Sequence, residues 1–139
     1  MYIFDTDHLT VLQRGGIGAT QLRKNLRERK IDRITTSIIS CEEQFQGWLN
    51  FIKRQESPER QALGYVELKR QLENYCTMNI MNFDRQASEE FQRLRKQYRR
   101  IGTMDLKIAS IAVMNKATVL TRNISDFGRI SVLQIENWT

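Results

Sequence analysis

The stretch that most constrains the fold is residues 103–127, TMDLKIASIAVMNKATVLTRNISDF. Its first half is apolar over much of a helical circumference, which predicts a helix packed hard against a sheet. Residues 118–121 form a short β-prone run, which predicts a buried strand. Thr103 is expected to cap the helix, so that Asp105 lies in the first helical turn. Asp126 is expected just past the carboxyl end of the strand, where open α/β sheets bind ligands.

The rest of the chain alternates short apolar runs with helical patterns, which predicts a parallel sheet covered on both faces. Further strands are expected at 2–4, 34–39, 78–83 and 131–135, and further helices at 7–13, 20–29, 40–55, 58–75 and 85–98. The predicted fold class is α/β, with three layers (α/β/α) and a central parallel sheet of about four to five short strands. Residues 2–4 are expected to be a central strand. At 139 residues the chain fits one domain, residues 1–139.

The net charge indicates which kind of partner the chain can bind, and the cysteine content indicates which cell compartment it suits. The 22 Lys and Arg residues exceed the 16 Asp and Glu residues, and a formal net charge of +6 is compatible with a polyanionic partner. Basic residues concentrate in 23–33 and 93–100, where solvated helix faces are the simpler interpretation. Cys41 and Cys76 form no CxxC pair, which favours a reducing cytoplasm. No signal peptide is recognisable, and no apolar run approaches the roughly 18 residues of a membrane span.

Four acidic residues are expected at one edge of the sheet, although they are spread along the whole chain. They are Asp5, Glu43, Asp105 and Asp126. Clustered carboxylates are hard to ionise unless a cation neutralises them. Mg²⁺ or Mn²⁺ suits such oxygen ligands, activates water and stabilises the charge that develops on a phosphodiester. The sequence therefore predicts hydrolytic cleavage of a phosphate backbone.

Glu43 and two residues close to Asp5 in the sequence also have structural interpretations. Ser40 followed by Glu43 has the spacing of a capping box, in which the glutamate serves only the helix start. Local sequence does not separate that role from a role in the acidic site. Asp7 is expected to cap the helix at 7–13, and His8, the only histidine, to be a structural residue of that helix.

Three blocks of the sequence carry a resemblance to a known family. FDTDHLTVLQR, SIISCEEQFQGWL and GTMDLKIASIAVMNKATVLTRNISDFGRI together resemble a PIN-domain protein of the VapC toxin type. The third block is the most specific, because an aspartate opening an apolar helix is followed there by a strand and TRNxxDF. The resemblance covers essentially the whole chain.

The resemblance implies an activity, a site and partners. Asp5, Glu43, Asp105 and Asp126 would form the acidic site, with Asp5, Asp105 and Asp126 as metal ligands and Thr121 and Asn123 as supporting residues. The implied activity is a Mg²⁺- or Mn²⁺-dependent endoribonuclease of a toxin–antitoxin pair, which acts on cellular RNA. The implied partners are a cognate antitoxin and a second copy of the chain.

The sequence departs from the family pattern at two places. Asp7 stands where asparagine is common, which places an extra carboxylate near the site. Glu42 and Glu43 stand side by side, and Gln44 follows where an apolar residue is usual. Glu43 is preferred as the site glutamate because Gly47 follows it by four residues, as in the family.

Two alternative hypotheses come from other functional classes. Asp5-Thr6-Asp7 after an apolar strand resembles the first motif of phosphohydrolases of the haloacid dehalogenase type, with Asp5 as nucleophile and Asp7 as acid and base. The later acidic motif of that class is missing. The other alternative is a non-catalytic module that binds RNA or protein and no longer uses its carboxylates.

Overall fold

The computed structural model describes all 139 residues as short parallel strands alternating with helices. The strands are β1 (Tyr2–Phe4), β2 (Thr35–Ser37), β3 (Asn79–Met81), β4 (Thr118–Leu120) and β5 (Gln134–Glu136). The helices are α1 (Thr6–Arg14), α2 (Ile17–Glu28), α3 (Ile38–Arg54), α4 (Pro58–Cys76), α5 (Arg85–Gln97), α6 (Thr103–Met114) and α7 (Ile124–Phe127). The predicted α/β class is confirmed, and every expected helix and strand is present.

The five strands form two ladders instead of one continuous sheet. β4 pairs with β1 and β5, and β2 pairs with β3, all in parallel. The two ladders meet at β1 and β2, where the Thr36 hydroxyl donates a 2.9 Å hydrogen bond to the carbonyl of Phe4. Residues 2–4 form the edge strand of the hydrogen-bonded β1-β4-β5 ladder, but they have the expected central place in the layer of all five strands. β4 is the middle strand of its ladder, and β1 lies between β4 and the second ladder.

Alternate residues of β1 and β4 point into two different cores, as the two-residue period of a strand requires. Ile3 and Val119 pack into a cluster with residues of α5 and α6. Phe4 and Leu120 pack into a second cluster with residues of α1, α2 and the C-terminal Trp138. Because each face of the strands is covered by helices, the predicted three-layer arrangement is confirmed.

Helix α6 has the burial that its sequence predicts. Its apolar residues from Leu106 to Ala112 pack in the core almost all round, and the first and last turns are partly exposed. One detail differs: the N-cap position is Gly102, which supplies no side-chain hydrogen bond, and Thr103 is the first helical residue. Asp105 still lies in the first turn, because the helix begins only one position earlier than a Thr103 cap would place it.

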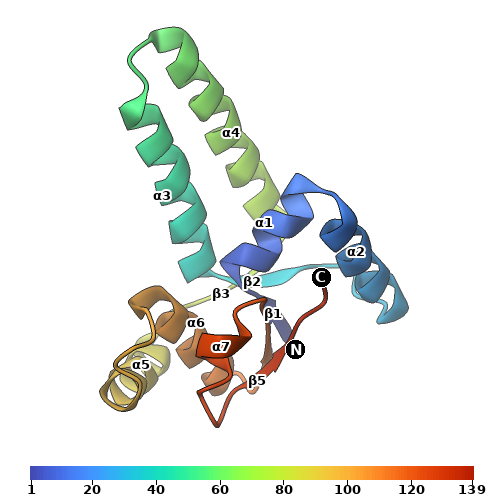
Figure 1. Ribbon diagram of the computed structural model, residues 1–139, viewed down its shortest axis with the longest axis vertical. Helices are drawn as coiled ribbons and strands as arrows, with labels where there is room; N and C mark the ends of the chain where they lie inside the picture. Colours follow the sequence, from blue (N-terminus) through green and yellow to red (C-terminus); the bar gives the residue numbers. More distant parts are fainter.

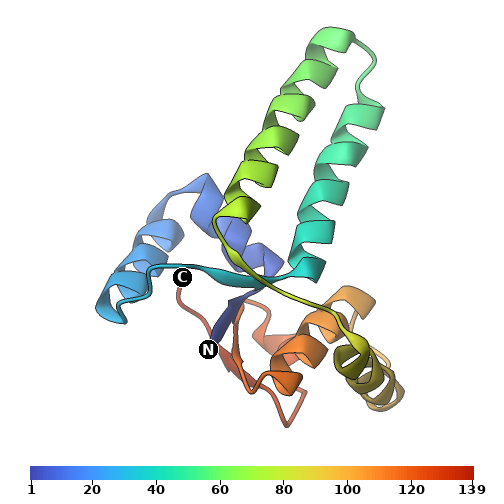
Figure 2. The same cartoon turned by 180° about the vertical axis from the view of Figure 1, so that it is seen from behind.

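Helices α3 and α4 form an antiparallel hairpin that projects from the rest of the molecule (Figure 1). Ser57 caps α4 and Pro58 opens it, so the expected turn before the second helix is confirmed. The two helices approach closely at Gly64, where an added Cβ would lie 2.5 Å from Cγ1 of Ile52. Seen from behind, β2 and β3 run from this hairpin toward α2 and α5 respectively (Figure 2).

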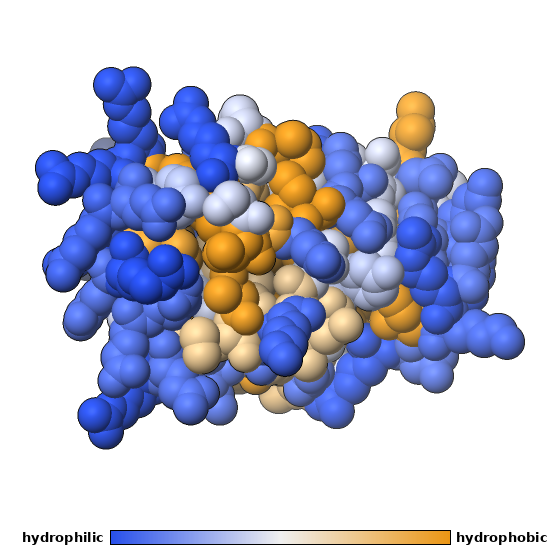
Figure 3. Space-filling model, turned by 90° about the horizontal axis from the view of Figure 1, so that it is seen from below, coloured by the Kyte–Doolittle hydropathy of each residue, from blue (hydrophilic) through white to orange (hydrophobic).

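The two basic segments lie on opposite sides of the molecule, because α2 and α5 flank the strands from opposite sides (Figures 1 and 2). From below, hydrophilic side chains occupy both sides of the surface and an apolar band lies between them (Figure 3). No helix is long and apolar enough to cross a membrane.

Candidate functional site

Asp5 occupies the first position after β1 and is 5% exposed. It is the N-cap of α1, and its Oδ1 accepts a 2.7 Å hydrogen bond from the amide of His8. The expectation that Asp7 caps this helix is therefore wrong, because the helix begins at Thr6, directly after the strand, and Asp5 takes the cap position. Burial raises the pKa of Asp5 to about 6, and the charges of Asp7 and Asp105 add to the rise.

Asp105 and Asp126 are held together by one amide. Nδ2 of Asn123 donates to Oδ2 of Asp105 at 3.3 Å and to Oδ2 of Asp126 at 3.2 Å. Oδ1 of Asn123 accepts a 3.4 Å hydrogen bond from the amide of Asp126 and so caps α7. Burial raises the pKa of Asp105, and the charges of Glu43 and Asp126 add to the rise. Asp126 was expected in a turn and instead lies in this short helix, on the same side of the site.

Thr121 connects the two halves of the acidic cluster. Its Oγ1 accepts a 2.8 Å hydrogen bond from the amide of Asn123, and its hydroxyl is a hydrogen-bond partner that lowers the pKa of Asp5. Thr121 is fully buried at the end of β4. The supporting residues suggested by the sequence thus link Asp5 to Asp105 and Asp126.

Glu43 faces the site from α3. The hydroxyl of Thr6 donates a 2.7 Å hydrogen bond to its Oε1, and its charge raises the pKa of Asp105. Helix α3 is capped by Ser37, whose hydroxyl accepts from the amide of Ser40 at 3.1 Å. Since Ser40 lies inside the helix, the capping-box interpretation of Glu43 is wrong. Glu42 is exposed and forms no hydrogen bond through its side chain, so only Glu43 reaches the other acids.

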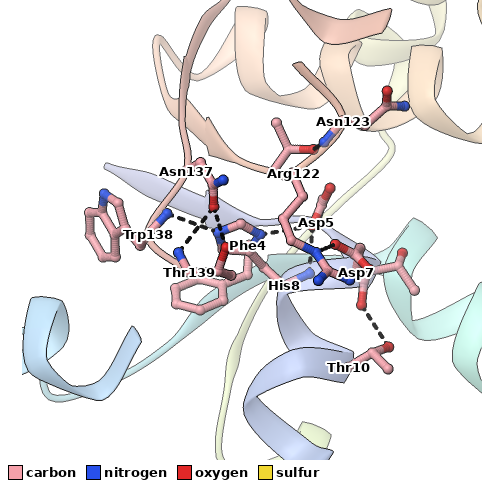
Figure 4. Close-up of polar contacts among 12 residues, drawn as sticks. Phe4, Asp5, Asp7, His8, Thr10, Arg122, Asn123, Asn137, Trp138 and Thr139 are labelled. Carbon is pink, nitrogen blue, oxygen red and sulfur yellow. Dashed lines mark hydrogen bonds and ion pairs between the residues drawn. The ribbon is translucent and has the colours of Figure 1, made fainter. Parts of the chain in front are cut away.

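Asp7 is held by Arg122 at the entrance to the site (Figure 4). Nε and Nη2 of Arg122 donate to Oδ2 and Oδ1 of Asp7 at 2.5 and 2.7 Å. This two-point ion pair lowers the pKa of Asp7. Arg122 therefore neutralises the extra carboxylate that distinguishes the chain from the usual family pattern. Neither Arg122 nor Thr6 was singled out from the sequence, although both stand inside the motifs that carry the acids.

His8 lies beneath Asp5 with no exposed surface. Its Nε2 accepts a 3.2 Å hydrogen bond from the amide of Trp138, and its Nδ1 has no hydrogen-bond partner and lies 3.7 Å from Oδ1 of Asp5 (Figure 4). Burial lowers the pKa of His8 to about 4, so the ring is neutral near pH 7 and carries its proton on Nδ1. This environment supports the structural role that the sequence indicates.

The donor set fits a divalent cation. Asp5 and Asp105 both resist ionisation, and a bound cation would relieve the repulsion among the carboxylates. Ligand atoms of Asp5, Asp7 and His8 also lie within 4.8 Å of one another. In that smaller group both oxygens of Asp7 accept hydrogen bonds from Arg122, and the imidazole of His8 is buried. Asp105 and Asp126 are therefore better placed than Asp7 and His8 to complete a metal site with Asp5.

Comparison with known proteins places the chain in a family. The model of the family described as PIN domain matches residues 2–133. The chain belongs to the PIN-domain family. This match confirms the resemblance that the three sequence blocks carry, and it spans all the acidic positions described above.

Curated relatives of this PIN-domain chain are named as ribonucleases. Ribonuclease VapC2 of Rickettsia felis is 37% identical over 65 residues, which cover 44% of this chain and 48% of that protein. Ribonuclease VapC1 of Haemophilus influenzae strain R2866 is 46% identical over 46 residues, which cover 33% of this chain and 34% of that protein. The matched segments thus span less than half the length of either relative.

Solved structures with the same PIN fold match over nearly the whole chain. VapBC-1 from nontypeable Haemophilus influenzae has a TM-score of 0.69 and 26% identity, and covers 99% of this chain and 97% of that one. VapBC2 from Rickettsia felis, solved bound to a DNA fragment from its promoter, has a TM-score of 0.73 and 24% identity, with 99% and 98% covered. FitAcB from Neisseria gonorrhoeae has a TM-score of 0.75 and 17% identity, with 99% and 97% covered.

Proposed function

We propose that the protein is a metal-dependent endoribonuclease whose site is formed by Asp5, Glu43, Asp105 and Asp126. The observation that carries the proposal is the hydrogen-bonded link from Asp5 through Thr121 and Asn123 to the other two aspartates. Names of the relatives support ribonuclease activity, and burial of the carboxylates supports a requirement for a cation.

In this proposal Asp5, Asp105 and Asp126 hold Mg²⁺ or Mn²⁺. When bound there, the cation would lower the pKa of a water molecule and offset charge on the phosphate. Asn123 positions the carboxylates of Asp105 and Asp126 through hydrogen bonds, and Thr121 positions that of Asp5. Arg122 keeps the neighbouring Asp7 out of the ligand set.

Glu43 positions the attacking water. Thr6 occupies Oε1 of Glu43, which leaves Oε2 free to accept a hydrogen bond from that water. As the water oxygen bonds to phosphorus, the bond from phosphorus to one ribose oxygen breaks, and the proton of the water passes to Glu43. The departing ribose oxygen takes a proton from solvent.

The partners follow from the same comparison. One similar structure is a toxin–antitoxin complex from Klebsiella pneumoniae, and others are VapBC proteins, a family named as toxin–antitoxin systems. We therefore extend the proposal to a toxin of such a pair, with a cognate antitoxin protein and a homodimeric toxin. Cellular RNA in the cytoplasm is the proposed substrate. The basic excess of the chain agrees with an RNA partner.

The two alternatives have less support. A phosphohydrolase of the haloacid dehalogenase type needs Asp7 as acid and base, and both oxygens of Asp7 are bound by Arg122. A non-catalytic module does not require four carboxylates to be brought together against their mutual repulsion.

The test is cleavage of total RNA by the purified protein with Mg²⁺ or Mn²⁺, with EDTA, and with the variants Asp105→Asn and Glu42→Gln. Discrete fragments are expected from the protein and from Glu42→Gln, but not with EDTA or from Asp105→Asn. Equal cleavage by Asp105→Asn would refute the site. A phosphorylated Asp5 trapped during turnover would support the phosphohydrolase instead, and metal-free RNA binding without cleavage would support the binding module.

A further inference from the structure

A cavity of about 550 Å³ lies between α1 and the α3–α4 hairpin, and it begins at the acidic site. Thr6 and Glu43, the pair joined by a 2.7 Å hydrogen bond, line its inner end. None of the three aspartates of the proposed metal site lines it, so the cavity is a neighbour of the metal site and not the site itself. Its volume is in the range of small-molecule sites.

The floor of the cavity is a fixed network of amides. Gln13 and Gln71 exchange two hydrogen bonds of 3.2 and 3.0 Å across α1 and α4. Gln44 donates to Gln13 at 3.2 Å and accepts from the hydroxyl of Tyr75 at 2.7 Å. Because the buried amides of Gln44 and Gln71 both bond to the exposed Gln13, the network connects three helices and keeps the cavity polar.

The walls of the cavity combine an aromatic ring with guanidinium groups. Trp48 and Phe51 are the two hydrophobic residues among the 14 that line it. Arg14 and Arg54 also line it, and neither forms an ion pair, whereas Arg70 pairs with Glu67. A polar chamber with one accessible indole and unpaired arginines matches a nucleotide, which has a flat base and a charged phosphate. It matches an apolar peptide face poorly.

We propose that this cavity is a nucleotide subsite for the RNA strand that is cut at the acidic site. A base stacks on Trp48, and the phosphate of the same strand pairs with Arg14. The subsite rests on the proposed ribonuclease function, because Thr6 and Glu43 are shared between the two. The strand then passes from the carboxylates directly into the cavity.

The test measures binding separately from cleavage. A short unstructured RNA is titrated into the Asp105→Asn protein with EDTA, and tryptophan fluorescence is recorded. Trp138 is only 3% exposed, so quenching reports Trp48. In the same background Trp48→Ala is assayed by RNA anisotropy and is expected to bind roughly tenfold or more weakly, while Trp48→Phe retains most of the affinity.

Arg14→Gln is compared with Arg60→Gln, which removes the same charge from α4 outside the cavity. Arg14→Gln is expected to reduce the slope of log K against log salt by about 0.7, the value for one phosphate contact on a single strand, and Arg60→Gln to leave it unchanged. In the otherwise native protein, Trp48→Ala is expected to raise KM for RNA.

Three results would overturn the subsite. RNA affinity and KM that are unchanged in Trp48→Ala and Arg14→Gln would refute it while leaving ribonuclease activity intact. Loss of binding to a partner protein in these variants, with RNA binding unchanged, would make the cavity a protein-binding groove. Absence of both RNA binding and cleavage in the native protein would refute the proposed function and the subsite together.

Discussion

Nδ2 of Asn123 lies 3.3 Å from Oδ2 of Asp105, although the two residues are 18 positions apart, Asp105 in α6 and Asn123 at the N-cap of α7. The same nitrogen lies 3.2 Å from Oδ2 of Asp126. Asn123 is thus the residue through which the two aspartates are positioned relative to each other. Its contribution is testable separately from the contribution of the carboxylates.

Asn123→Ala is expected to weaken Mn²⁺ binding and RNA cleavage by about 10- to 100-fold, the usual loss when a partner of a metal ligand is removed. Affinity is measured by calorimetric titration with Mn²⁺. The matched control is Asn115→Ala, because Asn115 donates only to the carbonyl of Ile111 at the end of α6. Equal losses in the two variants would show that Asn123 has no special relation to the site.

Glu43→Gln is expected to lower kcat for RNA cleavage by about 10²- to 10⁴-fold, as expected when a group that accepts a proton is neutralised. The glutamine can still accept the hydrogen bond from Thr6, so the fold is retained. Glu42→Gln, the change at the exposed neighbour, is expected to leave kcat unchanged. The reverse order of effects would show that the wrong glutamate has been assigned.

Asp5→Asn is expected to stabilise the protein without metal above pH 6. Folding raises the pKa of Asp5 from 3.8 to about 6, so the folded state binds more protons than the unfolded state between these values. The free energy of unfolding therefore does not suffer from the burial of Asp5 below pH 3.8, where the carboxyl is protonated in both states. It falls as the pH rises through 6, by up to about 3 kcal/mol.

Urea unfolding in EDTA at pH 7.5 and at pH 3.5 checks this prediction. The variant keeps a side-chain oxygen for the helix cap and is expected to gain stability only at the higher pH. Saturating Mn²⁺ is expected to raise the Tm of the native protein more than that of Asp5→Asn, because the carboxylate is a proposed ligand. A variant that is less stable at both pH values would contradict the assigned cause of the shift.

Trp138→Ala is expected to destabilise the protein by about 3–5 kcal/mol, because a large buried side chain leaves a cavity. Trp138 is 3% exposed and packs against Tyr2 at 4.7 Å and Phe4 at 6.3 Å between ring centroids. The guanidinium of Arg29 lies 4.3 Å from its ring. Urea unfolding measures the loss, and Trp48→Ala, a change at a partly exposed tryptophan, is expected to cost less. Similar losses would show that the C-terminal segment does not support the strand layer.

Local patterns were enough to predict most of the architecture. The apolar circumference of α6 predicted its burial, and the turn residues around Pro58 predicted the antiparallel hairpin. Strand ends and helix starts are local features, and parallel strands share one carboxyl edge. The sequence alone therefore placed Asp5, Glu43, Asp105 and Asp126 on one side of the sheet.

Only the tertiary structure decided which side chains contact the residues in and around the acidic site. Arg122 and Asp7 are 115 residues apart, and His8 and Trp138 are 130 residues apart. The helix cap at Ser37 also has a tertiary setting, because the preceding Thr36 is buried against the carbonyl of Phe4. Such contacts join residues that share no local periodicity, and they arise from packing distant segments together. The sequence determined where the carboxylates lie along the strand edge, and packing determined which of them are free, paired or shared.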